Sequence, residues 1–188
     1  VKGEYDLLLV GLGKSIFEGT ILGRVLGFTS RFINPDRLLD KFTGKEGLFE
    51  NSSFDDRTRL IISKSKTPLG ILIDKDLKKV ENVTIPIMSI GDAFLFDYAE
   101  RLIFNNNTKV TIIENEGQRK NNFIIENAVA GLKLKYANNL QIVEYGKLNK
   151  PLLEKQDLIV VSLESWKKIV DEEETWLSDI PSALIVKP

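Results

Sequence analysis

Short, continuously apolar runs separated by longer amphipathic stretches constrain the fold of this chain more than any other feature. Runs rich in Val, Ile and Leu without polar alternation are typical of strands covered on both faces, as in parallel sheets. Because helical patterns lie between them, we predict an α/β fold with a doubly wound parallel sheet. The predicted strands are Leu7–Val10, Leu69–Ile73, Ile85–Ile90, Val110–Ile113, Leu140–Val143, Leu158–Val161 and Leu184–Val186.

The expected helices lie near residues 16–27 and 54–64, after Asp92, and from Phe123 to Leu132. Asp92 is the expected N-cap of the third of these helices, since Asp is favoured at that position. An alternative role for Asp92, contact with an adenosine, is weaker.

Two segments are interpreted as connections, one as an insertion loop and the other as a linker. Residues 27–54 are dense in turn formers, such as Asn34-Pro35-Asp36, with one short helical stretch near Pro35–Phe42. They are predicted to form an insertion loop with little regular structure. The charged stretch Lys75–Asn82 is interpreted as a linker between two units.

Composition excludes several kinds of chemistry. The 188 residues contain no cysteine and no histidine, so disulfides, thiolate chemistry and the commonest general base are absent. A formal net charge of −1 gives no global field to hold a polyanion, so we expect no nucleic-acid partner. No apolar run approaches the ~18 residues that span a bilayer. The chain begins at Val1, shortly before an apolar strand, and is interpreted as a piece of a longer protein.

An internal repeat divides the chain. Tyr5–Val10 resembles Gln156–Val161, and Thr67–Ile73 resembles Ile180–Val186. We therefore predict that residues 1–77 are the C-terminal part of a first unit, with the insertion at about 27–54. Residues 78–188 are then a complete second unit. If the units match, the strand at residues 7–10 lacks its inner neighbour, and its bare edge predicts pairing into a homodimer.

A glycine-spaced loop follows the first strand. It reads Gly11-Leu12-Gly13-Lys14-Ser15, and nine residues separate Gly13 from Gly23, which Arg24 follows. Together with Asp-Leu-Leu-Leu-Val-Gly before it and a closing Pro-x-x-Ile-Leu-Ile strand, it resembles the universal stress protein family, whose fold is of the adenine nucleotide alpha hydrolase-like type. That family's pattern is Gly-x-x-Gly, nine residues, then Gly followed by Ser or Thr. Here the first glycine falls at Gly11, one position late, and Arg24 replaces the hydroxyl residue.

The resemblance implies a binding site for the phosphates of ATP or another adenine nucleotide. Its candidate residues are Gly11, Gly13, Lys14, Ser15, Gly23 and Arg24. Glycines let backbone N–H groups approach a phosphate, and a guanidinium can hold one. The alternative, glycines that serve only a tight strand-to-helix turn, stays open. The corresponding loop of the second unit, Val161–Trp166, has no glycine and is not expected to bind a nucleotide in this way.

The phrases Ser15–Gly19 and Leu22–Phe28, and the loop Thr43–Asn51, resemble the cytosolic tail of bacterial cation:proton antiporters. This implies a regulatory domain of a Na⁺/H⁺ or K⁺/H⁺ exchanger at the cytoplasmic side of the inner membrane. Its partners would be the membrane transport domain of the same polypeptide and a second copy.

Two other functions stay open, a stand-alone tandem universal stress protein that binds ATP and a small α/β hydrolase. No nucleophile–base pair is evident, so we expect no enzymatic activity and no metal site.

Overall fold

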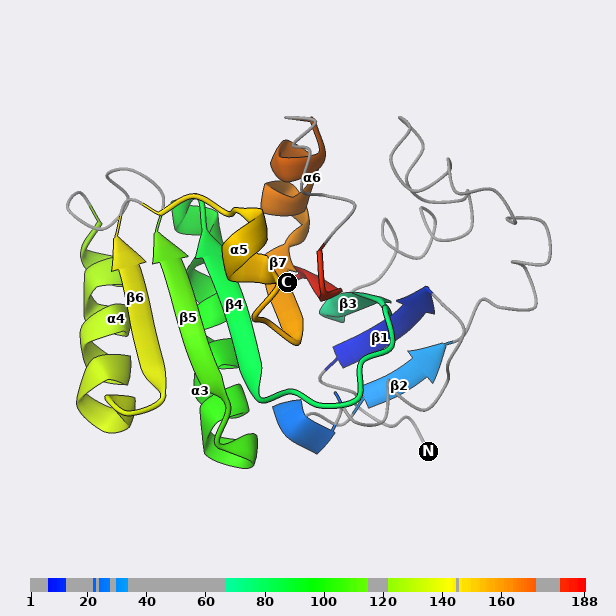
Figure 1. Ribbon diagram of the computed structural model, residues 1–188, viewed down its shortest axis with the longest axis horizontal. Helices are drawn as coiled ribbons and strands as arrows, with labels where there is room; N and C mark the ends of the chain where they lie inside the picture. Colours follow the sequence, from blue (N-terminus) through cyan, green and yellow to red (C-terminus); the bar gives the residue numbers. More distant parts are fainter. Residues whose placement is uncertain are drawn as a thin grey trace.

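The computed structural model describes residues 7–12, 22, 24–27, 30–33, 67–114, 122–144, 146–171 and 180–188. These residues form one eight-stranded sheet in the order β2-β1-β3-β8-β7-β4-β5-β6 (Figure 1). The strands are β1 Leu7–Leu12, β2 Ser30–Ile33, β3 Leu69–Ile73, β4 Asn82–Ile87, β5 Lys109–Glu114, β6 Leu140–Glu144, β7 Leu158–Ser162 and β8 Ser182–Lys187. All neighbours are parallel except β3 and β8.

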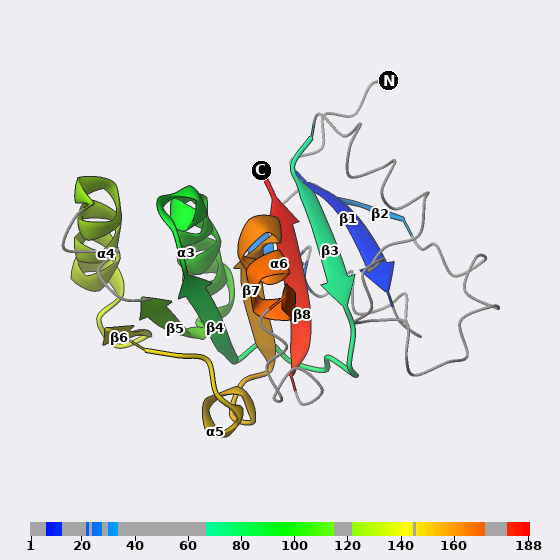
Figure 2. The ribbon, with the colours of Figure 1, turned by 90° about the horizontal axis from the view of Figure 1, so that it is seen from above.

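Helices cover both faces of this sheet, which confirms the predicted doubly wound α/β class. The described helices are η2 Ile90–Phe94, α3 Leu95–Asn106, α4 Phe123–Tyr136, α5 Lys150–Leu153 and α6 Leu163–Asp171. The buried side chains of α3 and α4 belong to one core cluster, and those of α5 and α6 to another. Figure 2 shows α3 and α4 together on one face, and α5 on the other.

The apolar strands supply both cores, as their sequences predicted. In β7, Leu158 and Val160 pack into the core under α3 and α4, and Ile159 and Val161 pack into the core under α6. Because successive side chains of a strand point to opposite faces, a strand between two helical layers needs apolar residues at every position.

The segment 27–54 contains a strand, so the prediction of a loop with little regular structure is wrong at residues 30–33. In the parallel register, β2 places Ser30 opposite Leu7 and Ile33 opposite Val10. It lies beside β1 as β4 lies beside β7, where Val83 is opposite Leu158. The bare edge predicted for β1 is therefore covered from within the chain, which removes that reason for pairing between copies. The helices predicted near Pro35–Phe42 and at 54–64 lie outside the described residues.

The β3–β8 contact joins the two halves of the sheet around a local two-fold relation. Ile71 pairs with Ile185 in antiparallel register. In the parallel pairs, Leu8 lies opposite Leu69 and Ile159 lies opposite Ala183. Since Leu8 and Ile159 are equivalent in the repeat, Leu69 corresponds to Ala183, one residue later than the sequences suggested. This correspondence between the repeats agrees with burial, because Leu69 and Ala183 both pack into the same core cluster, and a shift by one residue would turn one of them to the other face.

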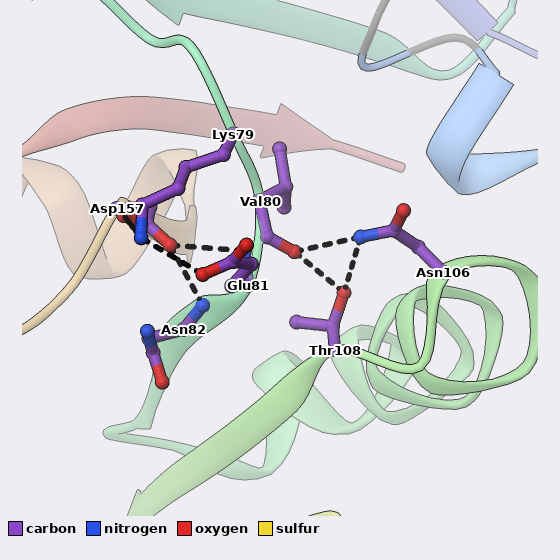
Figure 3. Close-up of polar contacts among 7 residues, drawn as sticks. All are labelled: Lys79, Val80, Glu81, Asn82, Asn106, Thr108 and Asp157. Carbon is purple, nitrogen blue, oxygen red and sulfur yellow. Dashed lines mark hydrogen bonds and ion pairs between the residues drawn. The ribbon is translucent and has the colours of Figure 1, made fainter.

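The connection at residues 75–82 is fixed to the second half of the sheet rather than lying free as a linker. Leu77 and Val80 are buried in the core. The Val80 carbonyl accepts hydrogen bonds from the Thr108 hydroxyl at 2.8 Å and from the Asn106 amide at 2.8 Å (Figure 3). The linker was predicted to extend to Asn82, but β4 already begins at that residue.

Asp157, just before β7, holds the end of this connection. Its Oδ2 accepts the backbone N–H groups of Glu81 at 2.9 Å and of Asn82 at 2.8 Å, as Figure 3 shows. The pKa of Lys79 is raised, first by its hydrogen bond to Glu81 and then by the charge of Asp157. Asp157, the acidic residue that precedes β7 in the repeat, therefore has a structural role.

Candidate functional site

The predicted nucleotide loop lies after β1, and the structure describes two of its six candidate residues. Gly11 is buried near the end of β1, opposite Leu72 of β3. Arg24 is exposed on a short helical segment. Gly13, Lys14, Ser15 and Gly23 lie outside the described residues, so the site as a whole stays a prediction.

The helical segment that carries Arg24 is fixed against α3. Leu22, Val25 and Leu26 are buried in the core cluster that also contains the side chains of α3. Gly27 ends the segment with a φ of 63°, and a Cβ there would lie 2.7 Å from Nδ2 of Asn105. The positive φ favours glycine at this position, where the first half of the chain lies against α3.

In the second half, the strand order reverses between β4 and β7. The chain runs outward through β4, β5 and β6 and then returns to the other side of β4 with β7 and β8. In open α/β sheets, ligands bind outside the carboxyl ends of the strands at such a switch point. Asp92, in η2 after β4, and Ser162, the last residue of β7, occupy this position.

Asp92 is buried there, with 1 % of its surface exposed, and both carboxylate oxygens are satisfied from within the chain. Oδ2 accepts the backbone N–H groups of Met88 and Ser89, each at 2.8 Å, and the Ser165 hydroxyl at 2.9 Å. Oδ1 accepts the Ser162 hydroxyl, and the single Ser165 hydroxyl proton is shared with it, since Ser165 Oγ also lies 3.0 Å from Oδ1. A buried carboxylate with this many donors has no acceptor capacity left for a ligand.

The two serines belong to the start of α6, which begins directly after β7. The Ser162 hydroxyl accepts the backbone N–H of Ser165 at 3.1 Å, as an N-cap residue does. No loop separates strand from helix, so the expectation of a loop over Val161–Trp166 is wrong. The Asp92 carboxylate bonds to both serines at the amino end of α6, where a phosphate would otherwise find N–H donors.

Asp92 is not the N-cap that the sequence suggested. The N-cap is Ser89, and Asp92 is the third helical residue of a capping box. The pattern Ser89-x-x-Asp92 carries this signal in the sequence. Ser162 and Ser165 were missed as partners because their hydroxyls meet Asp92 only in the folded sheet, although their three-residue spacing suits the first turn of a helix.

The described residues provide neither a cluster of metal ligands nor a membrane-spanning helix. They contain no group of three or more His, Cys, Asp or Glu side chains that could hold a metal ion. Among the same residues, no helix is both long enough and apolar enough to cross a membrane.

Comparison with known proteins gives structural likeness only. No protein-family model matches the sequence, and no curated protein matches it. The cytoplasmic domain of a prokaryotic cation chloride cotransporter is similar at 15 % identity over 96 % of this chain and 83 % of that chain, with a TM-score of 0.46. A universal stress protein from Archaeoglobus fulgidus is similar at 11 % identity over 95 % of each chain, with a TM-score of 0.46. At these values, function has to be argued from the residues of this chain.

Proposed function

We propose that this chain is a non-catalytic regulatory domain on the cytoplasmic side of a membrane cation:proton antiporter. In this proposal, the glycine loop after β1 senses an adenine nucleotide and the second half of the sheet is a closed scaffold. One observation supports this difference between the two halves. The Asp92 carboxylate accepts hydrogen bonds from Ser162 and Ser165 at the switch point of the second half. Only the first half keeps a glycine-spaced stretch between strand and helix.

The helical segment after the glycine loop could transmit the effect of nucleotide binding to α3, against which it packs. Leu22, Val25 and Leu26 share one core cluster with α3, and Gly27 lies against Asn105. A nucleotide that draws in Arg24 would bias the position of this segment and, through it, of α3. Signals of this kind need two arrangements of one packed element, which both sites can favour or disfavour.

The absence of histidine and cysteine in the whole chain supports a non-catalytic role. The buried Asp92 carboxylate at the switch point is already bonded by serines and cannot act as a base without losing them. The proposed partners are the transport domain of the same polypeptide and a second copy, and no nucleic acid is expected.

Calorimetric titration with Mg²⁺–ATP tests the sensing proposal. We expect binding of one nucleotide per chain, weakened at least about tenfold by Arg24→Ala, since one charged phosphate contact contributes roughly 1.5–3 kcal/mol. The matched control is Lys167→Ala, an exposed cation on α6, the helix that follows the equivalent strand β7. No heat at millimolar nucleotide, or equal effects of the two variants, would reject the site.

The antiporter assignment is tested separately by the encoding gene. The region upstream of Val1 is expected to encode around a dozen apolar spans, each about 20 residues long. A gene that encodes only a further soluble repeat would favour the stand-alone ATP-binding protein instead.

A further inference from the structure

Helix α4 carries apolar residues on two opposite sides, one buried and one exposed, with Glu126 and Lys133 on the flank between them. Ile125, Val129 and Leu132 are buried against the sheet. On the opposite side, the exposed fractions are 76 % for Phe123 and 89 % for Leu134. Large apolar side chains on the exposed side of a surface helix mark a candidate interaction face, and Figure 2 shows α4 at the end of its layer, beyond α3.

The exposed side of α4 has the spacing of a helix–helix seam. We call Phe123, Asn127, Ala130 and Leu134 the outer stripe; all four are exposed. Their spacing of four, three and four residues is that of the d and a positions of a heptad repeat. Gly131 lies beside the centre of the stripe, and a Cβ there would meet nothing within 4 Å. Small residues at the centre let two helices approach closely.

Charges beside the outer stripe favour a second copy in antiparallel orientation. Glu126 and Lys133 are exposed, lie seven residues apart on one flank, and pair with no other described residue. In an antiparallel pair, Glu126 faces Lys133 of the partner subunit, and the two-fold axis repeats this contact. In a parallel pair the g positions face e positions instead, so Glu126 would lie opposite Gly131 of the partner subunit and this charge pair would be lost.

We propose that α4 forms a symmetric antiparallel pair with α4 of a second copy. Phe123 then packs against Leu134 of the partner subunit, and Asn127 packs against Ala130 of the partner subunit. Such an isologous contact closes on itself as a dimer. In this pair α4 is the surface that joins the two copies, whether or not the glycine loop binds a ligand.

Charge reversal tests the orientation through sedimentation velocity over a concentration series. E126K and K133E are each expected to raise the dimer dissociation constant at least about tenfold, because each places like charges opposite each other twice. The double variant E126K/K133E restores opposite charges and is expected to return to within about threefold of the parent. Circular dichroism melting checks that each variant remains folded, since the changes also reverse charges in the first and last turns of α4.

Phe123→Ser provides the apolar test, with Phe104→Ser as its matched control. Phe104 is also 76 % exposed but lies on α3. Only Phe123→Ser is expected to weaken the dimer. A monomer at all concentrations up to about 1 mM, no recovery in the double charge variant, or equal effects of the two Ser variants would overturn the proposal.

Cysteine cross-linking maps the register, because the chain has no native cysteine. An equimolar mixture of Asn127→Cys and Ala130→Cys proteins is expected to form a disulfide-linked dimer under mild oxidation. The link should form several-fold faster than in either protein alone. Faster linkage of Ala130→Cys to itself would indicate a parallel pair. A dimer that cross-links at neither position would indicate another surface, such as the outer edge of β6, and would equally contradict the proposal.

Discussion

Asp92 occupies the carboxyl end of the sheet in the second half of the chain. Its carboxylate accepts hydrogen bonds from two backbone N–H groups of the turn after β4 and from the hydroxyls of Ser162 and Ser165. The same position in a parallel sheet is a common ligand site. Here the Asp92 side chain occupies it, and we propose that this position stabilises the second half of the sheet rather than binding a ligand.

Removal of this carboxylate should be costly. Asp92→Ala leaves the hydroxyls and N–H groups around it without their acceptor, so we expect the free energy of unfolding to fall by about 3 kcal/mol. The control is Asp97→Ala, which removes an exposed ion pair with Arg101 and should cost less than about 0.5 kcal/mol. Urea unfolding measures both. Equal losses in the two variants would show that the buried contacts do not stabilise the fold.

Tyr98 gives the fold a dependence on alkaline pH. Burial, and next the charge of Asp97, raise the pKa of its phenol. The neutral form is thus favoured in the folded state, and its stabilising effect is lost once the unfolded phenol ionises above about pH 10. The free energy of unfolding should therefore fall less between pH 9 and pH 11 in Tyr98→Phe than in the parent. Parallel pH profiles would contradict this.

At the scale of elements, the buried strands could be predicted because burial on both faces leaves a continuous apolar run. β2 could not, because Ser30-Arg31-Phe32-Ile33 is polar in part and lies at an end of the described sheet. α6 was missed at Leu163, Trp166 and Ile169, which follow β7 without a turn signal. α5 has only four residues, and its signal is the cap formed by Asn149.

Two glycines in different elements should respond to substitution with opposite signs. At Gly70 in β3, a Cβ would lie 2.9 Å from Leu9 Cδ1 and 3.1 Å from Leu184 Cδ1, both in the core. Gly70→Val should therefore lower the free energy of unfolding by about 1–3 kcal/mol.

At Gly131 in α4 a Cβ meets nothing within 4 Å, so Gly131→Ala should raise the free energy of unfolding by about 0.5–1 kcal/mol through helix propensity. Thermal and urea unfolding measure the pair. A stabilising Gly70→Val, or a destabilising Gly131→Ala, would show that the packing described around these strands and helices is wrong.

At the scale of the whole molecule, the connection at residues 75–82 joins the halves firmly. Its charged sequence suggested a linker. Leu77 and Val80 are buried although their neighbours are charged, and the sequence alone does not show the core into which these two side chains pack. The repeat predicted the related strands at both ends of the chain. It could not predict that β3 and β8 pair antiparallel, because that contact is between the units.

Limited trypsin digestion tests this connection. Cleavage after Lys78 and Lys79 should be slow in the parent, because the backbone around them is held by Asp157 and Thr108. Asp157→Ala should accelerate it several-fold, as local opening becomes easier. Glu81→Ala, which removes only the exposed pair with Lys79, is the control. Rapid cleavage in the parent would indicate two loosely joined domains.

We propose that the two halves of the chain differ: the first binds an anionic ligand, and the second is closed by the carboxylate of Asp92. Amide chemical shifts followed by NMR during titration with Mg²⁺–ATP test it most directly. We expect shift changes at the amides of Gly11, Arg24 and Gly27, and none at the amides of Ser162 and Ser165. Changes centred on Ser162 and Ser165, or no change anywhere at millimolar nucleotide, would contradict it.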